Sequence, residues 1–240
     1  MLLVVGRPPD ESSSRPRVRA TRKELTVTDE KTIADPGSLG LAAFAMTTFV
    51  LSVFNAGILD KASEPVFLCL AWFYGGLVQL LAGMWEFKNR NMFGATAFSS
   101  YAAFWIALGT YIYLSTAGGA PLKDSFGSSA MGLFLVSWTF FTFYMWIASM
   151  RISGALSTLF ALLFATYILL DMAQAGWISS VPAGYLGITT AAVAWYISAA
   201  GVINETWGRI VLPLWPVQKN AEPVAGRDRV KVKGSNVGHV

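Results

Sequence analysis

Apolar residues along this chain gather into six long runs that short polar links separate. Each run is about 20 residues long, which is the length that an α-helix needs to cross the ~30 Å hydrocarbon core of a bilayer. The runs lie at residues 39–59, 65–85, 93–115, 126–150, 153–172 and 183–203. The pattern therefore predicts an all-α polytopic membrane protein, with a six-helix transmembrane domain over residues 35–215.

The positions of Lys and Arg predict how these helices are oriented. With an even number of spans, both chain ends lie on one side of the membrane. That side carries sixteen of the eighteen Lys and Arg residues, and Lys61 and Lys123 are the other two. Positive charge is retained on the cytoplasmic side. Both termini are predicted to be cytoplasmic, with a disordered N-terminal tail at residues 1–34 and a cytoplasmic C-terminal tail at residues 216–240.

Composition agrees with a bilayer as the solvent. Only 13% of the 240 residues are charged and 54% are hydrophobic, whereas soluble domains carry about 25% charged residues. The net charge of +4 comes from basic residues that flank the apolar runs, so we interpret it as topology and expect no nucleic acid. The single cysteine, Cys69, excludes an internal disulfide, and with only His239 besides it a His/Cys metal site is excluded. No metal or cofactor is predicted.

The interiors of the predicted spans contain no Lys, Arg or His. A transporter that holds an anion by a buried cation would need one. The polar groups inside the spans are neutral instead, which suits a small solute that is bound weakly or crosses in protonated form. An enzyme is not expected, because no intramembrane pair of acids is present to carry chemistry. The many aromatic residues of span four are interpreted as facing lipid or a neighbouring subunit.

One face of the first span carries a mixed apolar and polar stripe. Phe44, Thr48, Leu51 and Asn55 recur at i, i+4, i+7 and i+11, which places them on one side of a helix. A packing stripe with interhelical hydrogen bonds is the interpretation that spacing alone favours. The alternative is a stripe that lines a path for solute.

The second span carries Gly75, Gln79 and Gly83 at i, i+4 and i+8. Two glycines that flank a glutamine allow another helix to approach closely, and this packing interpretation is favoured. A pore-lining amide is the alternative, and the two are compatible. In the third span, Tyr101 lies near the middle of the membrane and needs a partner for its hydroxyl. A hydrated path or a hydrogen bond to another helix would provide one.

Polar residues also mark the ends of the spans on the predicted cytoplasmic side. Asp35 and Pro36 predict a helix start, with Asp as the N-cap and Pro at the first helical position. Glu86 ends the second span, and Asn204 and Glu205 end the sixth. A solvated carboxylate is the favoured interpretation of both glutamates, and a proton-handling role is the alternative.

Three blocks of sequence carry a resemblance to a known family. The first has the family's usual form Asn-Pro-Ala-Pro-Leu-Gly-Leu, and here it is Asp35-Pro36-Gly37-Ser38-Leu39-Gly40-Leu41, followed by Phe44, Thr47-Thr48 and Asn55-Ala56-Gly57. The second comprises Phe73-Tyr74-Gly75-Gly76, Gln79, Gly83, Glu86, Asn91, Phe93-Gly94, Thr96-Ala97-Phe98, Ser100-Tyr101 and Phe104-Trp105. The third comprises Asn204-Glu205, Gly208-Arg209 and Val211-Leu212-Pro213. On these blocks the chain resembles the acetate uptake transporter family, which includes bacterial succinate–acetate permeases and fungal proteins associated with acetate uptake and ammonia export.

The resemblance implies transport of acetate and related small monocarboxylates, with succinate as a further candidate, across the plasma membrane. It also implies a homo-hexamer in which each six-helix protomer has its own pore, an architecture similar to that of proton-gated urea channels. A hydrophobic constriction in the family falls on Phe44 and Tyr101 here, together with a Leu from span five. Leu163 and Phe164 are the candidates for that third position.

We predict a solute path and a mouth on the cytoplasmic side. The path residues are Thr48, Asn55, Gln79, Thr96 and Phe98, and the mouth residues are Asp35, Pro36, Leu39, Gly40, Leu41, Glu86, Asn204 and Glu205. Two mouth positions depart from the family signature, because Asp35 replaces its Asn and Ser38 its second Pro. An acid at the mouth of an anion path should repel acetate at pH 7, unless a cation neutralises it.

Physical chemistry favours a proton-linked mechanism. A bare carboxylate pays heavily for leaving water in an aromatic constriction, whereas acetic acid, with a pKa slightly above the ~4.3 of a side-chain carboxyl, crosses more cheaply when protonated. Acetate with a proton, or the protonated acid, is the expected solute. A channel for a neutral solute such as urea, a short amide or ammonia is the alternative. A membrane sensor or adhesion scaffold is disfavoured, because the sequence shows no folded signalling domain.

Overall fold

The computed structural model describes residues 33–117 and 128–217, apart from the side chains of Lys61, Ala117 and Ser128. Within these ranges, six helical stretches are long and apolar enough to cross a membrane. They are α1 (Gly37–Asn55), the continuous run of α2 (Val66–Cys69), η2 (Leu70–Val78) and α3 (Gln79–Lys88), α4 (Met92–Ala117), α6 (Ser128–Ser149), α7 (Gly154–Gln174) and α8 (Val181–Trp207). The predicted all-α, six-span fold is confirmed, and the chain is a multi-pass membrane protein. Which side each end faces stays a prediction, and the predicted tails lie almost wholly outside the described residues.

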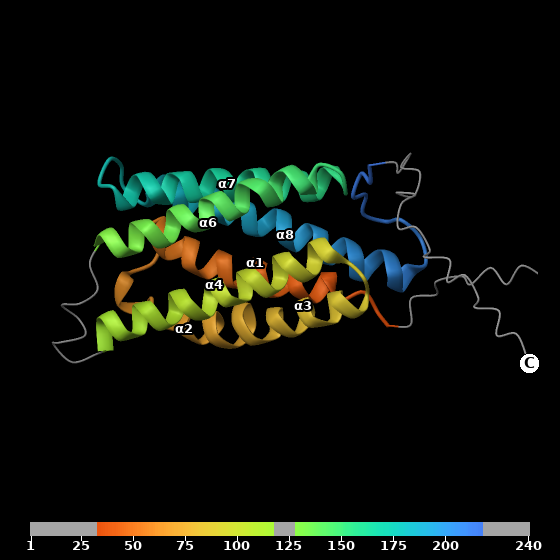
Figure 1. Cartoon of the computed structure of the whole chain (residues 1–240), viewed down its shortest axis with the longest axis horizontal. Helices are drawn as coiled ribbons and strands as arrows, with labels where there is room; N and C mark the ends of the chain where they lie inside the picture. Colours follow the sequence, from red (N-terminus) through yellow and green to blue (C-terminus); the bar gives the residue numbers. More distant parts are fainter. Residues whose placement is uncertain (1–32, 118–127, 218–240) are drawn as a thin grey trace, which may run out of the picture. The chain divides into compact units, whose positions relative to one another are not determined.

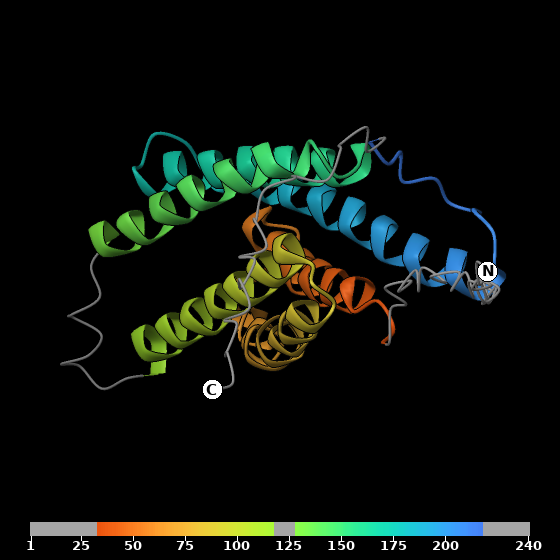
Figure 2. The same ribbon diagram turned by 45° about the vertical axis from the view of Figure 1, so that its right-hand side comes forward.

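The six spans form a bundle in which α1 and α8 lie between two outer pairs (Figures 1 and 2). Helices α6 and α7 run side by side along one side, and α4 with the second span runs along the other. Helix α1 begins and α8 ends at the same end of the bundle, at the right in Figure 1. The turns from α3 to α4 and from α6 to α7 lie at this end too. Four separate segments of the sequence therefore meet there.

Helices α1 and α8 pack against each other along their whole length. Gly184 of α8 lies so close to the α1 backbone at Asn55 that a Cβ would collide with it. Hydrogen bonds then join the two helices at both ends. Ser180 Oγ donates to the carbonyl of Asn55 at 3.1 Å, and Ser198 Oγ donates to the carbonyl of Ser38 at 2.6 Å. Such small-residue contacts and hydroxyl bonds are what hold transmembrane helices together, because lipid provides no hydrophobic drive.

The glycines of the second span have the packing role that their spacing predicted. Gly75 lies directly against the Thr47 side chain of α1, and Gly83 lies against Ser99 of α4, with no room for a Cβ at either. Between them, Gln79 is fully buried. The residues just before Gln79, in η2, form a π-helix, a conformation that is often found next to functional sites.

The aromatic residues of α6 face in two directions, which corrects the prediction that they all face outward. Phe140 and Tyr144 are 70% and 43% exposed on the surface of the chain. Trp138 and Phe141 instead turn inward, with ring centroids 5.9 and 5.3 Å from that of Tyr101. Consecutive helical residues point about 100° apart, so one aromatic run supplies both a lipid-exposed face and a packed face.

Candidate functional site

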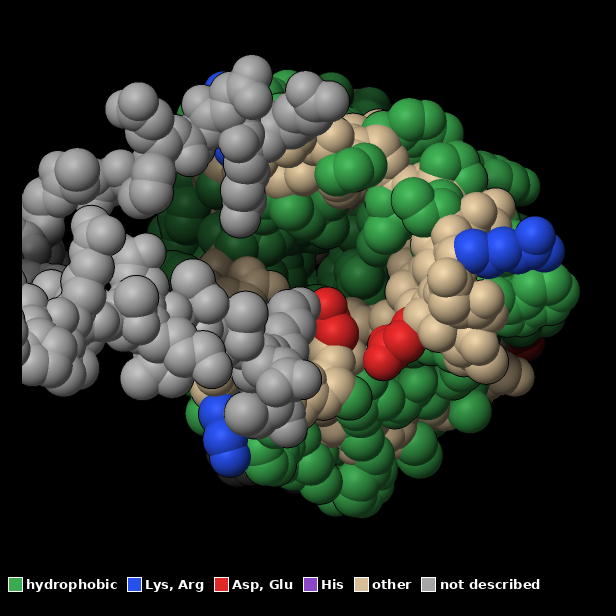
Figure 3. Space-filling view, turned by 90° about the vertical axis from the view of Figure 1, so that its right-hand side faces the viewer, with side chains coloured by type: hydrophobic (Ala, Val, Ile, Leu, Met, Phe, Trp, Pro, Cys, Tyr) green, Lys and Arg blue, Asp and Glu red, His purple; other side chains and the backbone are tan. Residues whose placement is uncertain are grey.

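A cavity of about 210 Å³, cavity 1, lies among α1, α3, α4, α7 and α8. It holds far more than the ~10–15 Å³ that one water molecule needs. Seen from the end where α1 begins and α8 ends, the molecule is hollowed, and acidic side chains lie at the rim of the hollow (Figure 3). Asp35 and Glu86 are the acids that line cavity 1. We call this opening the mouth, and it lies at the end that is predicted to be cytoplasmic.

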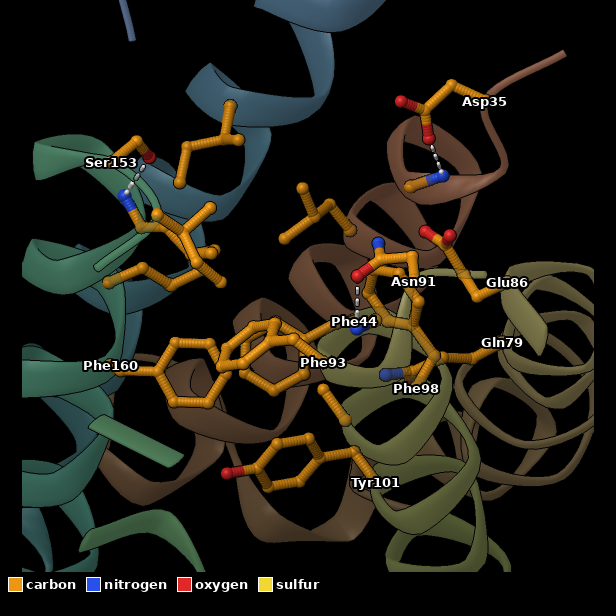
Figure 4. A pocket seen from close by; sticks show the side chains of 18 of the residues that line it. Asp35, Phe44, Gln79, Glu86, Asn91, Phe93, Phe98, Tyr101, Ser153 and Phe160 are labelled. Carbon is orange, nitrogen blue, oxygen red and sulfur yellow. Dashed lines mark hydrogen bonds between the residues drawn. The ribbon is translucent and has the colours of Figure 1, made fainter. Parts of the chain in front are cut away.

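The mouth has two chemically different walls (Figure 4). Asp35, Glu86 and Asn91, from the starts of α1 and α4 and the end of α3, form a polar wall. On the side of α7 the lining contains Ile152, Leu214 and Ser153, and Ser153 Oγ accepts the N–H of Leu156 at 3.2 Å, so this wall is mainly apolar. A solute with a polar head and an apolar tail therefore meets a surface for each.

Asp35 holds the start of α1. Its Oδ1 accepts the backbone N–H of Gly37 at 2.9 Å, so the side chain satisfies one of the free donors of the helix. The helix begins at Gly37 and Pro36 precedes it, one residue later than predicted, which is within the usual variation of helix ends. The carboxylate stays exposed at the mouth.

Glu86 is 1% exposed although it lines the cavity, so its interpretation as a solvated carboxylate is wrong. The physical reason is that α1 and α4 close over it at glycines. A Cβ on Gly37 or Gly94 would lie 3.3 or 2.8 Å from Glu86 Oε1. Asn89 Nδ2 donates to the other oxygen, Oε2, at 3.4 Å. The second acid of the mouth is thus embedded in the protein, at the point where three helices meet.

A second, smaller cavity of about 40 Å³, cavity 2, continues on the far side of Phe44. The predicted path residues Thr48 and Asn55 line it. Phe44 and Leu163 line both cavities, so these two side chains form the partition between them. Tyr101 lines cavity 1 with its ring centroid 5.8 Å from that of Phe44.

The structure thus brings together Phe44, Tyr101 and one of the two candidates from span five. Leu163 lies at the partition. Phe164 lines neither cavity and stacks instead on Trp146 of α6, with centroids 5.7 Å apart.

Polar atoms without a partner in the described chain lie on both sides of this partition. On the side of cavity 1, neither Nε2 nor Oε1 of the buried Gln79 has a hydrogen-bond partner. On the side of cavity 2, Thr48 Oγ1 and Trp105 Nε1 have none. Buried polar groups are nearly always satisfied, and each of these atoms is enclosed by protein in this structure. A solute or water would reach them only after neighbouring side chains move.

The hydroxyl of Tyr101 has an interhelical partner. It lies 2.9 Å from Thr142 Oγ1 of α6, and both residues are buried. The sequence left open whether this hydroxyl faces a hydrated path or bonds to another helix, and the structure contains the bond to another helix. The ring of Tyr101 therefore lines cavity 1 while its hydroxyl points toward α6 (Figure 4).

The remaining predicted residues divide into those that line a cavity and those that do not. Leu41 and Phe98 line cavity 1. Pro36, Leu39, Gly40, Thr96, Asn204 and Glu205 line neither cavity. Leu39 is 47% exposed, and a Cβ on Gly40 would lie 2.8 Å from the ring of Phe98, so Gly40 permits close packing of α1 on α4. These residues were assigned by their nearness in sequence to a motif, which does not determine the face on which a side chain lies.

Of the wall that α7 contributes, the sequence predicted only Leu163. Leu156, Leu159, Phe160 and Leu163 occupy one face of α7, and all four line cavity 1. Their spacing of i, i+3, i+4 and i+7 is helical, but α7 is apolar on its other faces too, so the pattern does not stand out. Asn91, whose Oδ1 accepts the N–H of Gly94 at 3.1 Å, was also missed as a mouth residue.

Among the described residues, the charged side chains that line the cavities are acids, Asp35 and Glu86, and no Lys, Arg or His lines either cavity. Within this part of the chain, an anion at the mouth therefore meets two acids and no cationic side chain.

Comparisons with known proteins agree with this architecture. The bacterial acetate channel SatP has a solved structure that superposes with a TM-score of 0.71 at 34% identity, covering 76% of this chain and 99% of that one. The succinate-acetate/proton symporter SatP of Escherichia coli K12 is 34% identical over 184 residues, which are 76% of this chain and 95% of the symporter.

Fungal relatives are also similar, although this chain spans only about two thirds of their length. Acetate permease A of Emericella nidulans is 38% identical over 78% of this chain and 67% of the permease. Ammonia transport outward protein 2 of Saccharomyces cerevisiae is 41% identical over 72% of this chain and 62% of that protein. The model of the GPR1/FUN34/yaaH family matches residues 19–219. The chain therefore belongs to the GPR1/FUN34/yaaH family.

Proposed function

We propose that this chain transports acetate and related small monocarboxylates across the plasma membrane, with succinate as a further candidate, and that it is not an enzyme. One observation carries the proposal. An apolar partition of Phe44 and Leu163 separates two cavities, and each cavity has buried polar atoms without a partner. The acetate and succinate–acetate functions named for the bacterial and fungal relatives support this choice of solute.

The chemistry of Gln79 favours the protonated acid over the anion. A side-chain amide offers one donor nitrogen and one acceptor oxygen. A protonated carboxyl group offers a donor O–H and an acceptor carbonyl, so it matches both atoms of Gln79, whose Nε2 and Oε1 lack partners. An ionised carboxylate accepts only and would leave Oε1 without a donor. The free energy of entering the apolar partition is also much lower for the neutral form.

The acidic wall of the mouth supports the same mechanism. Asp35 and Glu86 line the opening, and an ionised carboxylate there repels an anion but not the neutral acid. In the proposed sequence the anion reaches the mouth, takes a proton between the mouth and the partition, and passes Phe44, Tyr101 and Leu163 as the neutral acid. Thr48 and Trp105, which line cavity 2, then hydrogen-bond it. Because the mouth is predicted to be cytoplasmic, this order describes efflux, and uptake runs the same steps in reverse.

The proposed partners are the carboxylate, protons, the lipid bilayer and further copies of the chain in a homo-hexamer. The outer surface supports contact with lipid or with other copies, because large apolar side chains such as Phe73 and Phe140 are 65% and 70% exposed. The hexamer itself rests on the family resemblance.

Uptake of radiolabelled acetate by the purified full chain in liposomes tests the proposal. Protein-free liposomes give the background from passive diffusion, and a Leu163→Trp variant gives a chain with a filled partition. We expect protein-dependent uptake that an inward proton gradient increases, that excess propionate inhibits and that Leu163→Trp abolishes. Uptake equal to that of protein-free liposomes would overturn the proposal, and uptake indifferent to the gradient would overturn its proton linkage.

A neutral solute such as ammonia, urea or a short amide is the second candidate. The name of the Saccharomyces cerevisiae relative and the lack of a cationic side chain in the described cavity linings favour it. The same liposomes decide between the two, since urea or methylammonium in excess should inhibit acetate uptake only if they share its path. Protein-dependent uptake of methylammonium without any uptake of acetate would establish the second candidate in place of the first.

A further inference from the structure

The last described segment of the chain returns to the mouth. Helix α8 ends at Gly208, which has a left-handed backbone (φ 61°), and residues 209–217, which we call the strap, run from there to the start of α7 (Figure 1). Asn204 fixes the first part of the strap with three hydrogen bonds. Its Oδ1 accepts the N–H groups of Val211 and Leu212 at 2.7 and 2.9 Å, and its Nδ2 donates to the carbonyl of Leu212 at 2.8 Å.

Tyr196 fixes the second part of the strap. Its hydroxyl donates to the carbonyl of Pro213 at 2.7 Å, and its ring stacks on that of Trp215 with centroids 6.4 Å apart and planes 18° apart. Both Asn204 and Tyr196 belong to α8, so this helix holds the strap at two places.

The far end of the strap binds the first turn of α7. The N–H of Gly154 donates to the carbonyl of Trp215 at 2.8 Å, and the N–H of Ala155 donates to that of Leu214 at 3.3 Å. The first N–H groups of a helix lack partners inside the helix, and here two carbonyls of the strap accept hydrogen bonds from two of these N–H groups. The N–H of Val217 in turn donates to the carbonyl of Ile152 at 3.1 Å. The strap thus joins the end of α8 to the beginning of α7.

One strap side chain, Leu214, lines cavity 1. It lies on the apolar wall of the mouth with Ile152, and Asp35, Glu86 and Asn91 form the polar wall. Its neighbours on the strap do not share this position. Ile210, for example, is 80% exposed and lines neither cavity.

From these observations we propose that Leu214 is a specificity-determining residue, and that Asn204 is the positioning residue that holds it in the mouth. This inference rests on the proposed function, and it specifies that the protein selects its substrate by the length of the alkyl chain. The carboxyl group of the solute faces the polar wall, its alkyl chain faces Leu214, and the fixed strap limits the length of alkyl chain that fits. The sequence predicts Asn204 and Glu205 as mouth residues, with proton handling as the alternative for Glu205. In the structure Asn204 lines neither cavity, and holding the strap gives it a role at the mouth.

Competition measures chain-length selection without interference from passive diffusion. The concentration of butyrate that halves protein-dependent acetate uptake is determined for wild type, Leu214→Ala and the strap control Ile210→Ala. We expect Leu214→Ala to lower that concentration about threefold or more, because removing carbons from a wall admits a longer substrate. Ile210→Ala should equal wild type. An unchanged butyrate value for Leu214→Ala, with acetate uptake intact, would overturn the assignment of Leu214 and leave the proposed function standing.

Asn204 needs a readout that a purely structural role would not change. In a Cys69→Ser background, Leu214→Cys reacts with a charged, membrane-impermeant thiol reagent at a rate that reports its position. Adding Asn204→Ala should change that rate about threefold or more, and Asn204→Asp, which retains the acceptor for both N–H groups, should restore most of it. An unchanged rate would overturn the positioning role. This assay does not depend on transport, so it tests the position of the strap even if the wild-type protein carries no acetate. An absence of acetate transport would contradict the proposed function but not the role of Asn204.

Discussion

Phe44 of α1 and Leu163 of α7 line both cavities, so a solute that passes from one cavity to the other must pass between helices that are distant in sequence. Both side chains are buried, at 5% exposure each. The ring of Tyr101 lies beside Phe44, with centroids 5.8 Å apart, and extends the apolar surface on the side of the mouth. The role of this partition in transport can be tested by substitution, because a residue next to Leu163 in the sequence, Phe164, lines neither cavity and serves as a control.

Shortening Leu163 should open the partition. Leu163→Ala removes apolar volume shared by the two cavities, so we expect protein-dependent acetate flux in liposomes to rise roughly three- to tenfold, which corresponds to a barrier lower by about 1 kcal/mol. Phe164→Ala is the matched control, because Phe164 stacks on Trp146 away from both cavities. Equal effects of the two substitutions would show that the flux responds to loosening of α7 in general and not to the partition.

Gln79 should show opposite effects on stability and transport. A buried polar group without a partner costs about 1–3 kcal/mol, and both polar atoms of Gln79 lack one. The isosteric change Gln79→Met should therefore raise the thermal unfolding temperature of the empty protein in detergent while lowering acetate flux about tenfold. Gln174→Met on α7, outside both linings, should leave flux unchanged. A variant that loses stability and flux together would mean that Gln79 is a packing residue only.

The spacing of polar and apolar residues along α1 marks out one face of that helix, although spacing alone favoured a packing stripe over a path lining. Phe44, Thr48 and Asn55 recur at helical spacing, and all three line a cavity. The facing wall of α7 could not be predicted from the pattern of its residues, because a helix that is apolar on every side gives no contrast between its faces. Leu163 was a candidate only through the family resemblance. Membrane spans are in this respect harder to interpret than soluble helices, in which the solvent-exposed side is polar.

The burial of Glu86 could not be predicted for a different reason. Its place at the end of a span predicted an interfacial carboxylate, but its 1% exposure depends on Gly37 and Gly94, which belong to two other helices. The strap depends likewise on Asn204 binding backbone groups seven and eight residues further along the chain. Such contacts follow from how elements pack, which local sequence patterns do not encode.

The hydroxyl of Tyr101 should matter for stability and little for transport. Its partner at 2.9 Å is Thr142, so Tyr101→Phe and Thr142→Val should each lower the free energy of unfolding by about 1 kcal/mol, and the double variant should lose less than the sum. Acetate flux of Tyr101→Phe should stay within about twofold of wild type, whereas Tyr101→Ala should change it strongly. A tenfold loss in Tyr101→Phe would show instead that the solute uses this hydroxyl.

Asp35 should slow the arrival of anions at the mouth. The substitution Asp35→Asn removes one negative charge but keeps a side-chain oxygen that can accept the N–H of Gly37, so the helix start is preserved. Unit charges a few ångströms apart interact by roughly 1 kcal/mol in water. We therefore expect acetate uptake into liposomes at pH 7, through the copies whose mouth faces outward, to rise about two- to fivefold in 20 mM salt, and the gain to shrink in 500 mM salt, because salt screens exposed charges.

The matched control for Asp35 is Asp60→Asn. Asp60 is exposed too, and its Oδ1 accepts the N–H of Ala62 two residues on at 3.2 Å, the same type of bond that Asp35 makes to Gly37, but it lines neither cavity. Its substitution should leave uptake unchanged at either salt concentration. If Asp35→Asn also leaves uptake unchanged at low salt while wild type transports acetate, then the acid enters already neutral, and protonation precedes the mouth. If both variants gain equally, the net charge of the protein, and not its mouth, controls the approach of the solute.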